Sequence, residues 1–451
     1  MNRRHFITTS AVAGLPFITQ AQVKNPTSYL TPDHPDYNTA RQLYNADLDH
    51  KPAFIAQCTQ ETDIQKALTF AADQGLAVSV KSGGHCFLGS SMSEGSLAID
   101  LSKMTQRVYL PRSKKFTSAP GLKLGKLYDT LLPHRRLLPA GSCSGVGLGG
   151  LTLGGGYGLF ARQYGLTCDH LTRVKMISGE GKLVDSDSDP DLLWATRGGG
   201  NGNFGIITSM EFNTRPAPAR LGARRFFAKK VDSKKAIQLM KAWFEIASTL
   251  PDPIFGAFVF NHRTISLLLT STYPTTGPSF TKATRALIAA GFTARLPTNS
   301  PIARAVSYYY GRQDPLPFHN VSGGYYHGFQ DLEESSEFIA ETVTTTPNLI
   351  FQINTLGGAI TRGPDSAYPH REYPFMGEIQ GYWQRPSERD NLIEKVTLLR
   401  KTINAKAHYR NYPDPSLNNY KEVYYGKNLP RLLSLKTKYD PQNQIRHQQS
   451  L

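Results

Sequence analysis

The sequence of 451 residues is short of cysteine and of charged residues, and both shortages exclude classes of protein. Four cysteines are far too few to form a disulfide scaffold for a chain of this length. No Cys-x-x-Cys or His-Glu-x-x-His spacing occurs, so we expect no metal site. Charged residues make up only 19% of the chain, and 39 Gly and 29 Pro are spread through it, which excludes a coiled coil, collagen and general disorder.

After the first few dozen positions the sequence lacks the run of about 18 apolar residues that a membrane-spanning helix requires. The formal net charge is +16, but the basic residues are scattered. The densest basic runs, at 112–115 and 229–235, are not interleaved with aromatic residues. We therefore expect no nucleic-acid partner. A weak attraction to anionic envelope surfaces or acidic glycans is the remaining interpretation of the charge.

The first 21 residues are typical of a twin-arginine export signal. Arg3 and Arg4 are followed by a short, weakly apolar core and by small residues that end at Ala21. The alternative is an ordinary basic N-terminus. The signal predicts a periplasmic or secreted protein that begins near Gln22, and a route that carries folded chains suits a protein that acquires a cofactor in the cytoplasm.

The first half of the chain has a mixed order of helix and strand patterns that predicts an α+β fold. A helix is expected over 62–75, with a capping box of Thr62 and Gln65, one face formed by Ile64, Leu68 and Ala72, and an end at Gly75. We also expect strands at 77–80, 97–101 and 203–213, helices at 124–132 and 191–198, and a hairpin of 173–177 with 182–186.

A second domain is predicted over 215–404, where glycine clusters thin out. Strand patterns at 224–231, 256–261, 265–271 and 349–357 alternate with helical ones at 234–248, 279–291, 332–343 and 387–403. This predicts an antiparallel sheet with helices on one face. The remaining segments are the first part of the other domain, 30–214, and a tail from 405 to 451.

The strongest chemical signal is the stretch 141–158, GSCSGVGLGGLTLGGGYG, in which nine of eighteen residues are glycine. Such density predicts a backbone that closely approaches a ligand or presents its N–H groups to an anion. Leucines and a tyrosine interleave with the glycines, which is typical of a packed loop rather than a mobile linker.

Two familiar motifs are weighed against this interpretation. GNGNFG at 200–205 matches the dinucleotide pattern but follows a helix and precedes a strand, the reverse of the required order. GSCSG at 141–145 resembles a nucleophile elbow, with Cys143 as the nucleophile of a cysteine hydrolase. An elbow needs a helix directly after it, and 146–156 is the poorest helix-forming stretch in the chain. The hydrolase therefore stays a minor alternative.

A second glycine turn, Ser82-Gly83-Gly84-His85, follows a predicted strand. An imidazole and a thiol, here His85 and Cys143, are the side chains that form covalent bonds to an isoalloxazine ring. The pair in two glycine loops therefore suggests a flavin.

These segments resemble the berberine bridge enzyme-like FAD-linked oxidases. The resemblance runs from about residue 50 to the C-terminus. It is carried by SVKSGGHCFLGSS, PAGSCSGVGLGGLTLGGGYGLFARQYGLTCDHL, LLWATRGGGNGNFGIITSMEF, AYPHR, YRNYPDPSL, YYGKN and PRLLSLKTKYDPQNQIRHQQS. It implies a two-part FAD-binding domain of the PCMH type, with the substrate domain inserted and the tail returning to the FAD domain.

The resemblance also implies bicovalent FAD, with His85 bound to the 8-methyl carbon of the flavin and Cys143 to ring carbon 6. The other cofactor-binding positions that it implies are Ser82, Gly83, Gly84, Cys86, Gly89, Ser90, Gly141, Ser142, Val146, Gly147, Gly149, Gly150, Gly154, Gly155, Gly158, Gly205, Ile206, Ile207, Tyr412 and Asn428.

Two positions bear on the electron acceptor. Val146 occupies the family's gatekeeper position, where a small β-branched residue is associated with oxygen access. Leu151 stands where many members carry a histidine near the flavin, so the family's handling of oxygen transfers less directly. The resemblance favours an oxidase that reduces O2 to hydrogen peroxide over a dehydrogenase with another acceptor.

The family's catalytic base is the second tyrosine of a Tyr-x-Asn-Tyr motif, here Tyr412. A phenol with a pKa of about 10 needs a neighbour to ionise near neutral pH, and Tyr409 is the expected partner. Glu378 and Gln380 share a predicted strand face with Met376 and are further catalytic candidates.

The substrate is left open. A sugar oxidised at its anomeric carbon and a phenolic or polycyclic metabolite both fit, and the tyrosines at 308–310 and 325–326 are either stacking platforms or core. We expect a monomer. An exported binding protein without activity is the alternative from another class.

Overall fold

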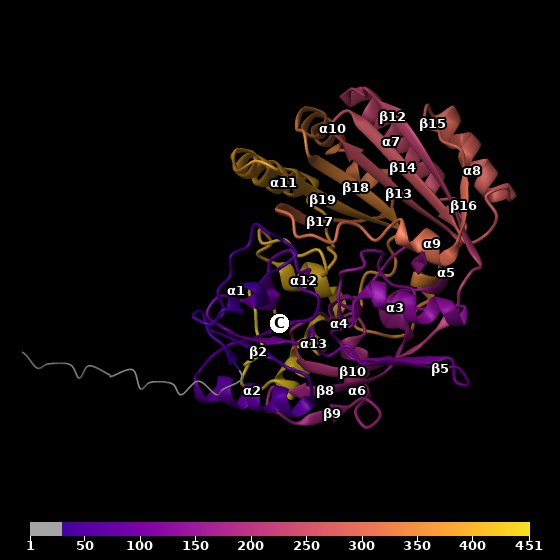
Figure 1. The fold of residues 1–451 in the computed structure, drawn as a ribbon. Helices are drawn as coiled ribbons and strands as arrows, with labels where there is room; N and C mark the ends of the chain where they lie inside the picture. The colour runs from indigo at the N-terminus through magenta and orange to yellow at the C-terminus, as the bar shows by residue number, and fades with distance from the viewer. Residues whose placement is uncertain (1–28) are drawn as a thin grey trace, which may run out of the picture.

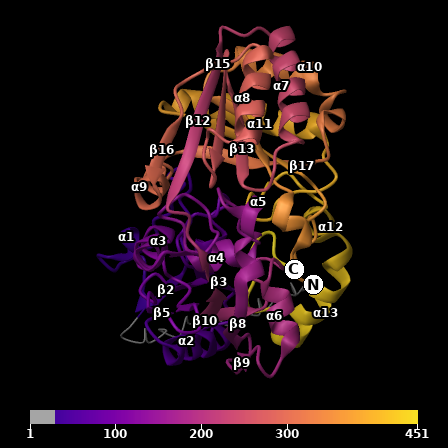
Figure 2. The same cartoon turned by 90° about the vertical axis from the view of Figure 1, so that its right-hand side faces the viewer.

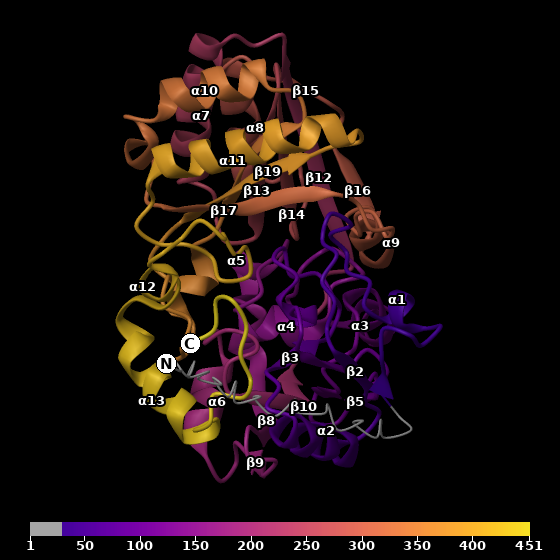
Figure 3. The same ribbon diagram turned by 90° about the vertical axis from the view of Figure 1, so that its left-hand side faces the viewer.

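The computed structural model describes residues 29–451, which form a lower and an upper half in Figure 1. The predicted export signal at residues 1–21 lies outside the described residues. Figures 2 and 3 show the same two halves from the sides, with the C-terminal segment running down one flank of the lower half. The mixture of helices and sheets confirms the predicted α+β class. Within the described residues, no helix is long and apolar enough to cross a membrane.

The lower half is built from short elements of the N-terminal part of the chain. They are β1 (Tyr29–Leu30), α1 (Tyr37–Ala40), β2 (Phe54–Gln57), α2 (Glu61–Asp73), β3 (Val78–Lys81), β4 (Leu97–Asp100), β5 (Arg107–Leu110), β6 (Lys115–Ser118), α3 (Leu124–Leu131), β7 (Arg136–Leu137), α4 (Leu148–Leu153), α5 (Ala161–Tyr164), β8 (Leu171–Ser178), β9 (Leu183–Asp185), α6 (Pro190–Thr196), β10 (Gly205–Asn213) and β11 (Arg215–Pro216).

Two sheets form the frame of the lower half. The first has the order β1-β2-β4-β3, in which β2 and β3 run parallel to β4. The second has the order β5-β6-β10-β8-β9 and is antiparallel throughout. It contains the predicted hairpin, as β8 and β9. The sheets meet where Ile177 and Ile206 pack with α2 and the first sheet.

The C-terminal segment completes the lower half, as the resemblance implies. It contains α12 (Tyr420–Tyr425) and α13 (Leu429–Tyr439). Beyond them, the N–H group of Val78 donates to the carbonyl of Gln444 at 2.8 Å, and Ile445 forms a parallel bridge with Val78. A buried ion pair of Lys436 with Asp440, 2.6 Å long, holds the turn before this contact.

The upper half is one antiparallel sheet with the order β15-β12-β14-β13-β18-β19-β17, and β16 also pairs with β12. Its elements are β12 (Arg220–Lys229), α7 (Ser233–Ala247), β13 (Ile254–Asn261), β14 (Thr264–Ser271), α8 (Pro278–Ala289), β15 (Thr293–Ala294), β16 (Thr298–Pro301), α9 (Ile302–Ser307), β17 (Phe318–Tyr326), α10 (Ser336–Thr345), β18 (Leu349–Thr355), β19 (Phe375–Tyr382) and α11 (Arg389–Ile403). The predicted strands and helices of this domain are all present.

Alternation along the strands gives this sheet one apolar and one polar face. Ile353 and Ile379 point to the face covered by α7, α8, α10 and α11, where they join a core that includes Trp243 and Val396 (Figure 1). The alternate positions of β17, β18 and β19 carry polar side chains toward the lower half. The candidate site lies on that polar side.

The predicted details of α2 are partly wrong. The helix begins at Glu61, and its capping box joins Gln60 to Asp63 rather than Thr62 to Gln65, because the side chain of Asp63 accepts hydrogen bonds from the turn before it. Ala72 is exposed. Gly75 does adopt a left-handed conformation, with φ +63°, just after the helix.

Candidate functional site

The two glycine-rich loops pack directly against each other. A side chain on Gly83 would place its Cβ 2.2 Å from the backbone nitrogen of Gly147, and one on Gly147 would meet the Ser82 hydroxyl. That hydroxyl donates to the carbonyl of Pro120 at 2.6 Å. The predicted close backbone approach is present, and much of it is between the loops themselves.

His85 and Cys143 are brought close together where these loops meet, a region that we call the recess. The imidazole of His85 lies over Gly145, two residues from Cys143, and stacks on the ring of Tyr44 with centroids 4.2 Å apart and planes at 18°. Burial lowers the pKa of His85 to about 4, so its ring is neutral at physiological pH. Gly311, from the upper half, lies beside the Cys143 sulfur.

The thiol of Cys143 belongs to an exposed residue, but the surrounding protein raises its pKa, and the negative charge of Glu378 raises it further. A hydrolytic cysteine needs the opposite shift, toward the thiolate. A helix does follow this loop, as α4, so the expectation that no helix forms there was wrong. Within this helix, Gly149 packs against Pro120, an approach that only glycine allows.

Several other predicted cofactor positions face protein. Gly154 packs on the amide of Asn411, Gly155 on the ring of Tyr368, and Gly158 on the carbonyl of Ala140. These glycines shape the loop rather than offer free backbone.

The remaining predicted positions are distributed as follows. Gly84, Cys86, Gly89 and Ser90 lie in the turn after β3, and Gly141, Ser142, Val146 and Gly150 lie in the loop around Cys143 and at α4. Gly205 packs against Ile177, while Ile206 and Ile207 bury their side chains in two cores, so only their backbone could face a ligand. The amide of Asn428 donates to the carbonyls of Ser366 and Ala367.

The hydroxyl of Tyr412 is hydrogen-bonded to Tyr157 and not to Tyr409. The two oxygens are 2.5 Å apart, and the Tyr157 oxygen also accepts from Nδ2 of Asn354 at 3.1 Å. The hydroxyl of Tyr409 accepts from the N–H group of Gly156 at 3.1 Å. Tyr409 was therefore the wrong partner, because the turn that holds both tyrosines directs it toward the glycine loop.

Glu378 and Gln380 extend this hydrogen-bonded group. Both are buried on β19, and Gln380 and Tyr412 lie close enough to the carboxyl group of Glu378 to lower its pKa. Gln380 donates to Gln352 at 3.3 Å, and Gln352 donates to Oδ1 of Asn354 at 3.1 Å. With Tyr157, Tyr412 and Glu378, these residues form a polar cluster of six side chains between the sheet and the glycine loop.

A charge is costly in this buried polar cluster. Burial raises the pKa of Glu378 to about 7, although Gln380 and Tyr412 lower it. Burial also raises the pKa of Tyr412 well above its ordinary value, and the neighbouring carboxylate of Glu378 adds to that shift. Tyr412 is therefore protonated near neutral pH, while Glu378 changes its charge there.

Sequence reasoning missed Tyr157, Gln352 and Asn354. Tyr157 was noticed only as a packing residue among the glycines. Gln352 and Asn354 are two apart on β18, and a polar pair in a strand otherwise rich in Ile and Phe was the available signal. It could not show which lower-half residue the pair would meet.

The tyrosines considered as stacking platforms separate into two groups. Tyr325 and Tyr326 are core residues of β17. Tyr308 is 57% exposed, and the carbonyl of Tyr310 accepts from the N–H group of Ser144, beside Cys143. Only the first group of tyrosines, at 308–310, therefore lies at the rim of the recess.

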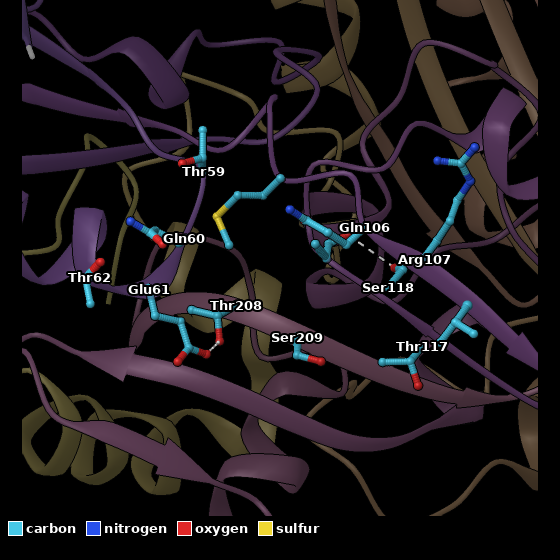
Figure 4. Close-up of a pocket in the computed structure, with 13 residues that line it drawn as sticks. Thr59, Gln60, Glu61, Thr62, Gln106, Arg107, Thr117, Ser118, Thr208 and Ser209 are labelled. Atoms are coloured by element: carbon cyan, nitrogen blue, oxygen red, sulfur yellow. Dashed lines mark hydrogen bonds between the residues drawn. The ribbon is translucent and has the colours of Figure 1, made fainter.

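A cavity of about 610 Å³ lies elsewhere, between the start of α2 and the β5–β6–β10 side of the second sheet (Figure 4). Its only carboxylate is Glu61, which points at Thr208 and accepts its hydroxyl at 2.6 Å. None of the predicted site residues lines it. No cluster of His, Cys, Asp and Glu suited to a metal ion occurs in the described part of the chain.

The recess fits a flavin cofactor by its chemistry. It combines a neutral imidazole, a thiol and a glycine cradle in which Cβ atoms would collide. Two family models match the chain in the corresponding segments. The model for the FAD binding domain covers residues 52–187, and that for berberine and berberine-like proteins covers residues 408–451.

Whole-chain similarity decides the family. The FAD-linked oxidoreductase YgaK of Bacillus subtilis is 31% identical, over 94% of this chain and 96% of its own length. A chitooligosaccharide oxidase of Gibberella zeae is 30% identical, over 90% of this chain and 89% of its own. The chain belongs to the berberine bridge enzyme-like FAD-linked oxidoreductases.

Solved structures agree with this berberine bridge enzyme-like assignment. A chitooligosaccharide oxidase structure superimposes with a TM-score of 0.83 at 27% identity, covering 94% of this chain and 96% of that one. BBE-like 1 of Physcomitrella patens gives a TM-score of 0.84 at 23% identity, over 93% and 95%. The chain is an FAD-linked oxidoreductase, and the cysteine hydrolase alternative is wrong.

Proposed function

We propose that this enzyme oxidises a C–OH group of a sugar at the polar face of β17, β18 and β19, and passes the electrons to O2. FAD, when bound, accepts a hydride at N5. The observation that carries the proposal is the polar cluster of Tyr157, Tyr412, Glu378, Gln380, Gln352 and Asn354.

The composition of this polar cluster favours a polyhydroxylated substrate. Gln352, Asn354 and Gln380 each present amide groups that donate and accept hydrogen bonds, as adjacent sugar hydroxyls do. Asn320, next to Gln380 across the strands, keeps a buried Oδ1 without a partner. A phenolic substrate is the second candidate, favoured by the parallel rings of Phe87 and Tyr412, which are 5.3 Å apart.

The pKa shifts suggest a proton path through two residues, Tyr412 and Glu378. Tyr412 receives the hydroxyl proton of the substrate as its own proton moves to Glu378. The direct alternative, prior ionisation of Tyr412, is opposed by burial and by the adjacent carboxylate. Tyr157 and Asn354 hold the Tyr412 oxygen in position during the transfer.

Two covalent bonds to FAD are part of the proposal, through His85 and Cys143. A neutral imidazole keeps a nucleophilic nitrogen, and the recess brings both loops together. The chemistry of these two side chains supports the assignment.

The decisive experiment offers cello-oligosaccharides, chito-oligosaccharides and aromatic alcohols to the holoenzyme without oxygen. We expect an oligosaccharide to bleach the flavin absorbance near 450 nm, and an acid product to follow in air. If only aromatic alcohols reduce the flavin, the substrate would be phenolic rather than a sugar. Bound flavin that no compound reduces would favour a binding protein.

If oxygen is the electron acceptor, one molecule of hydrogen peroxide should form for each molecule of substrate that is oxidised. Val146, whose N–H group donates to the Cys143 carbonyl, supports the proposal by its position beside the flavin recess. Val146→Leu should slow reoxidation of reduced flavin by air at least about tenfold, because the larger side chain blocks approach to the ring, while anaerobic reduction stays unchanged. Wild-type enzyme that is stable in air once reduced, but reacts with quinones, would be a dehydrogenase.

Export by the twin-arginine pathway remains part of the proposal, supported by Arg3 and Arg4. Changing both to lysine should leave flavin-loaded enzyme in the cytoplasm, measured by fractionation. Unaltered export would show that another route is used.

A further inference from the structure

The imidazole ring of His85 is held by stacking and not by hydrogen bonds. It lies on the ring of Tyr44, with centroids 4.2 Å apart and planes at 18°, and a Cβ atom on Gly145 would be 2.9 Å from its Nε2 atom. Within the described part of the chain, no group is hydrogen-bonded to either ring nitrogen of His85. By contrast, Nε2 of His170 and Nε2 of His370 each lie 2.9 Å from a carbonyl oxygen. Both nitrogens of His85 are therefore free for another group, and Tyr44 sets the plane of the ring.

Tyr44 is itself fixed between the two halves of the molecule. Its N–H group donates to the carbonyl of Gly84, in the glycine turn of the lower half, at 3.0 Å. Its carbonyl accepts from the N–H group of Leu316 at 3.1 Å, and its hydroxyl donates to the carbonyl of Arg312 at 3.3 Å. The orientation of the Tyr44 ring thus depends on the glycine turn and on segment 310–318 of the upper half.

The next residue, Asn45, reinforces this contact. It is only 4% exposed, and its Oδ1 atom accepts from the N–H group of Phe318 at 3.3 Å. Its Nδ2 atom donates to the carbonyls of Phe318 and Phe87, at 3.0 Å and 3.3 Å. A buried amide whose donor and acceptor are both used holds its surroundings rigidly. Asn45 therefore keeps Tyr44 in register with segment 310–318.

Segment 310–318 also contacts the second glycine loop. The carbonyl of Tyr310 accepts from the N–H group of Ser144 at 3.1 Å. A Cβ atom on Gly311 would lie 3.5 Å from the sulfur of Cys143. One segment of the upper half therefore borders both side chains that we propose as flavin attachments, and it reaches His85 only through Tyr44.

We propose that Tyr44 is a positioning residue for the formation of the bond between His85 and FAD. Its ring fixes the plane of the imidazole, so that a free ring nitrogen faces the methyl carbon of the flavin. The proposal rests on the proposed bond through His85, but not on the substrate or on the bond through Cys143. Correct orientation of two reacting groups contributes large factors to a rate, and stacking is the contact that orients this ring.

The bond-forming step requires no residue other than His85 as a reactant. One C–H bond of the flavin methyl group and the N–H bond of the imidazole break, and a C–N bond forms. The two electrons and two protons that are released reduce the flavin ring, and O2 then takes them up as hydrogen peroxide. Tyr44 stays chemically unchanged and supplies only the orientation of the imidazole.

The test follows the attachment of FAD to full-length Cys143→Ala protein made in riboflavin-starved cells, in which only the His85 bond can form. FAD is added in air, samples are precipitated with acid over time, and the flavin absorbance of the washed pellets is measured. Tyr44→Leu should slow attachment at least about tenfold, because the imidazole loses its stacking partner. Tyr44→Phe keeps the ring and should recover most of this loss. Tyr44→Met is the second variant without a ring, should Tyr44→Leu melt as an unfolded protein.

The same substitution in the His85→Ala background separates positioning from a general structural effect. There only the Cys143 bond can form, and Tyr44→Leu should leave its rate unchanged. Tyr373→Leu is the matched control in the Cys143→Ala background, because Tyr373 also stacks on a histidine, His327, at 4.5 Å, and it should have no effect.

Two results would overturn the role of Tyr44. These are an unchanged rate of the His85 bond without the ring, and equal slowing of the His85 and Cys143 bonds. A Cys143→Ala parent with Tyr44 intact that never retains flavin after acid would be a different failure. It would refute the His85 bond itself, and the positioning role with it.

Discussion

Tyr412→Phe should slow anaerobic reduction of the flavin by substrate about 10²- to 10⁴-fold, the usual contribution of general-base catalysis. The substitution keeps the ring stacked on Phe87 and deletes only the hydroxyl, which is hydrogen-bonded to Tyr157 and lies near Glu378. Folding and flavin content should therefore stay normal. Stopped-flow absorbance near 450 nm measures the rate.

The pH profile of the same reaction identifies the final proton acceptor. Glu378 must be ionised to take the proton, and its pKa is about 7, so the rate should rise with pH through about 7 and then level off. Glu378→Gln should remove this rise and slow the reaction. A Tyr412→Phe enzyme within threefold of the unaltered rate, with the same profile, would transfer the role to another residue.

Tyr409→Phe is the matched control for this prediction. It also removes a phenol from the turn, but that hydroxyl accepts from the N–H group of Gly156 and from Nδ2 of Asn411, whereas the Tyr412 hydroxyl is bonded to Tyr157. Its cost should appear mainly in stability, because a buried donor loses its acceptor, typically about 1–3 kcal/mol.

The second large effect is expected from removing both flavin attachments. His85→Ala and Cys143→Ala should each keep flavin after acid precipitation, through the remaining bond, whereas the double variant should release all of it. The wild-type pellet should stay yellow after washing. A colourless wild-type pellet would show that the flavin is bound without covalent bonds.

Fluorescence of the single variants distinguishes the two bonds. In the Cys143→Ala protein, the retained flavin should fluoresce in unfolded protein as a histidyl flavin, and in the His85→Ala protein a thioether on the ring should quench it. If one of the single variants releases its flavin, only one covalent bond to the flavin is supported.

The sequence could predict the fold because its patterns are local. Amphipathic helices such as α7 and α11 and the strands around them follow from periodicity. The candidate site could be predicted only in part. His85, Cys143 and Tyr412 lie in distinctive motifs, but the partner of Tyr412 depends on how two halves of the molecule meet.

The failures have the same physical origin. Periodicity and helix propensity do not contain the contact of Gly149, in α4, with Pro120, nor that of Tyr157 with Asn354. Asn354 is 197 residues from Tyr157, and contacts of that range depend on tertiary packing, which overrides local preference.

The contact of Val78 with Gln444 and Ile445 sets the order in which the protein can be made. A ribosome releases the first sheet long before it synthesises the chain that lies beside β3. The inserted sheet, β12 to β19, is formed by one continuous segment of the chain. It can therefore fold before the C-terminal segment of the lower half is synthesised. Removing residues 442–451 should therefore leave a folded upper half and a lower half whose first sheet lacks the segment that pairs with Val78.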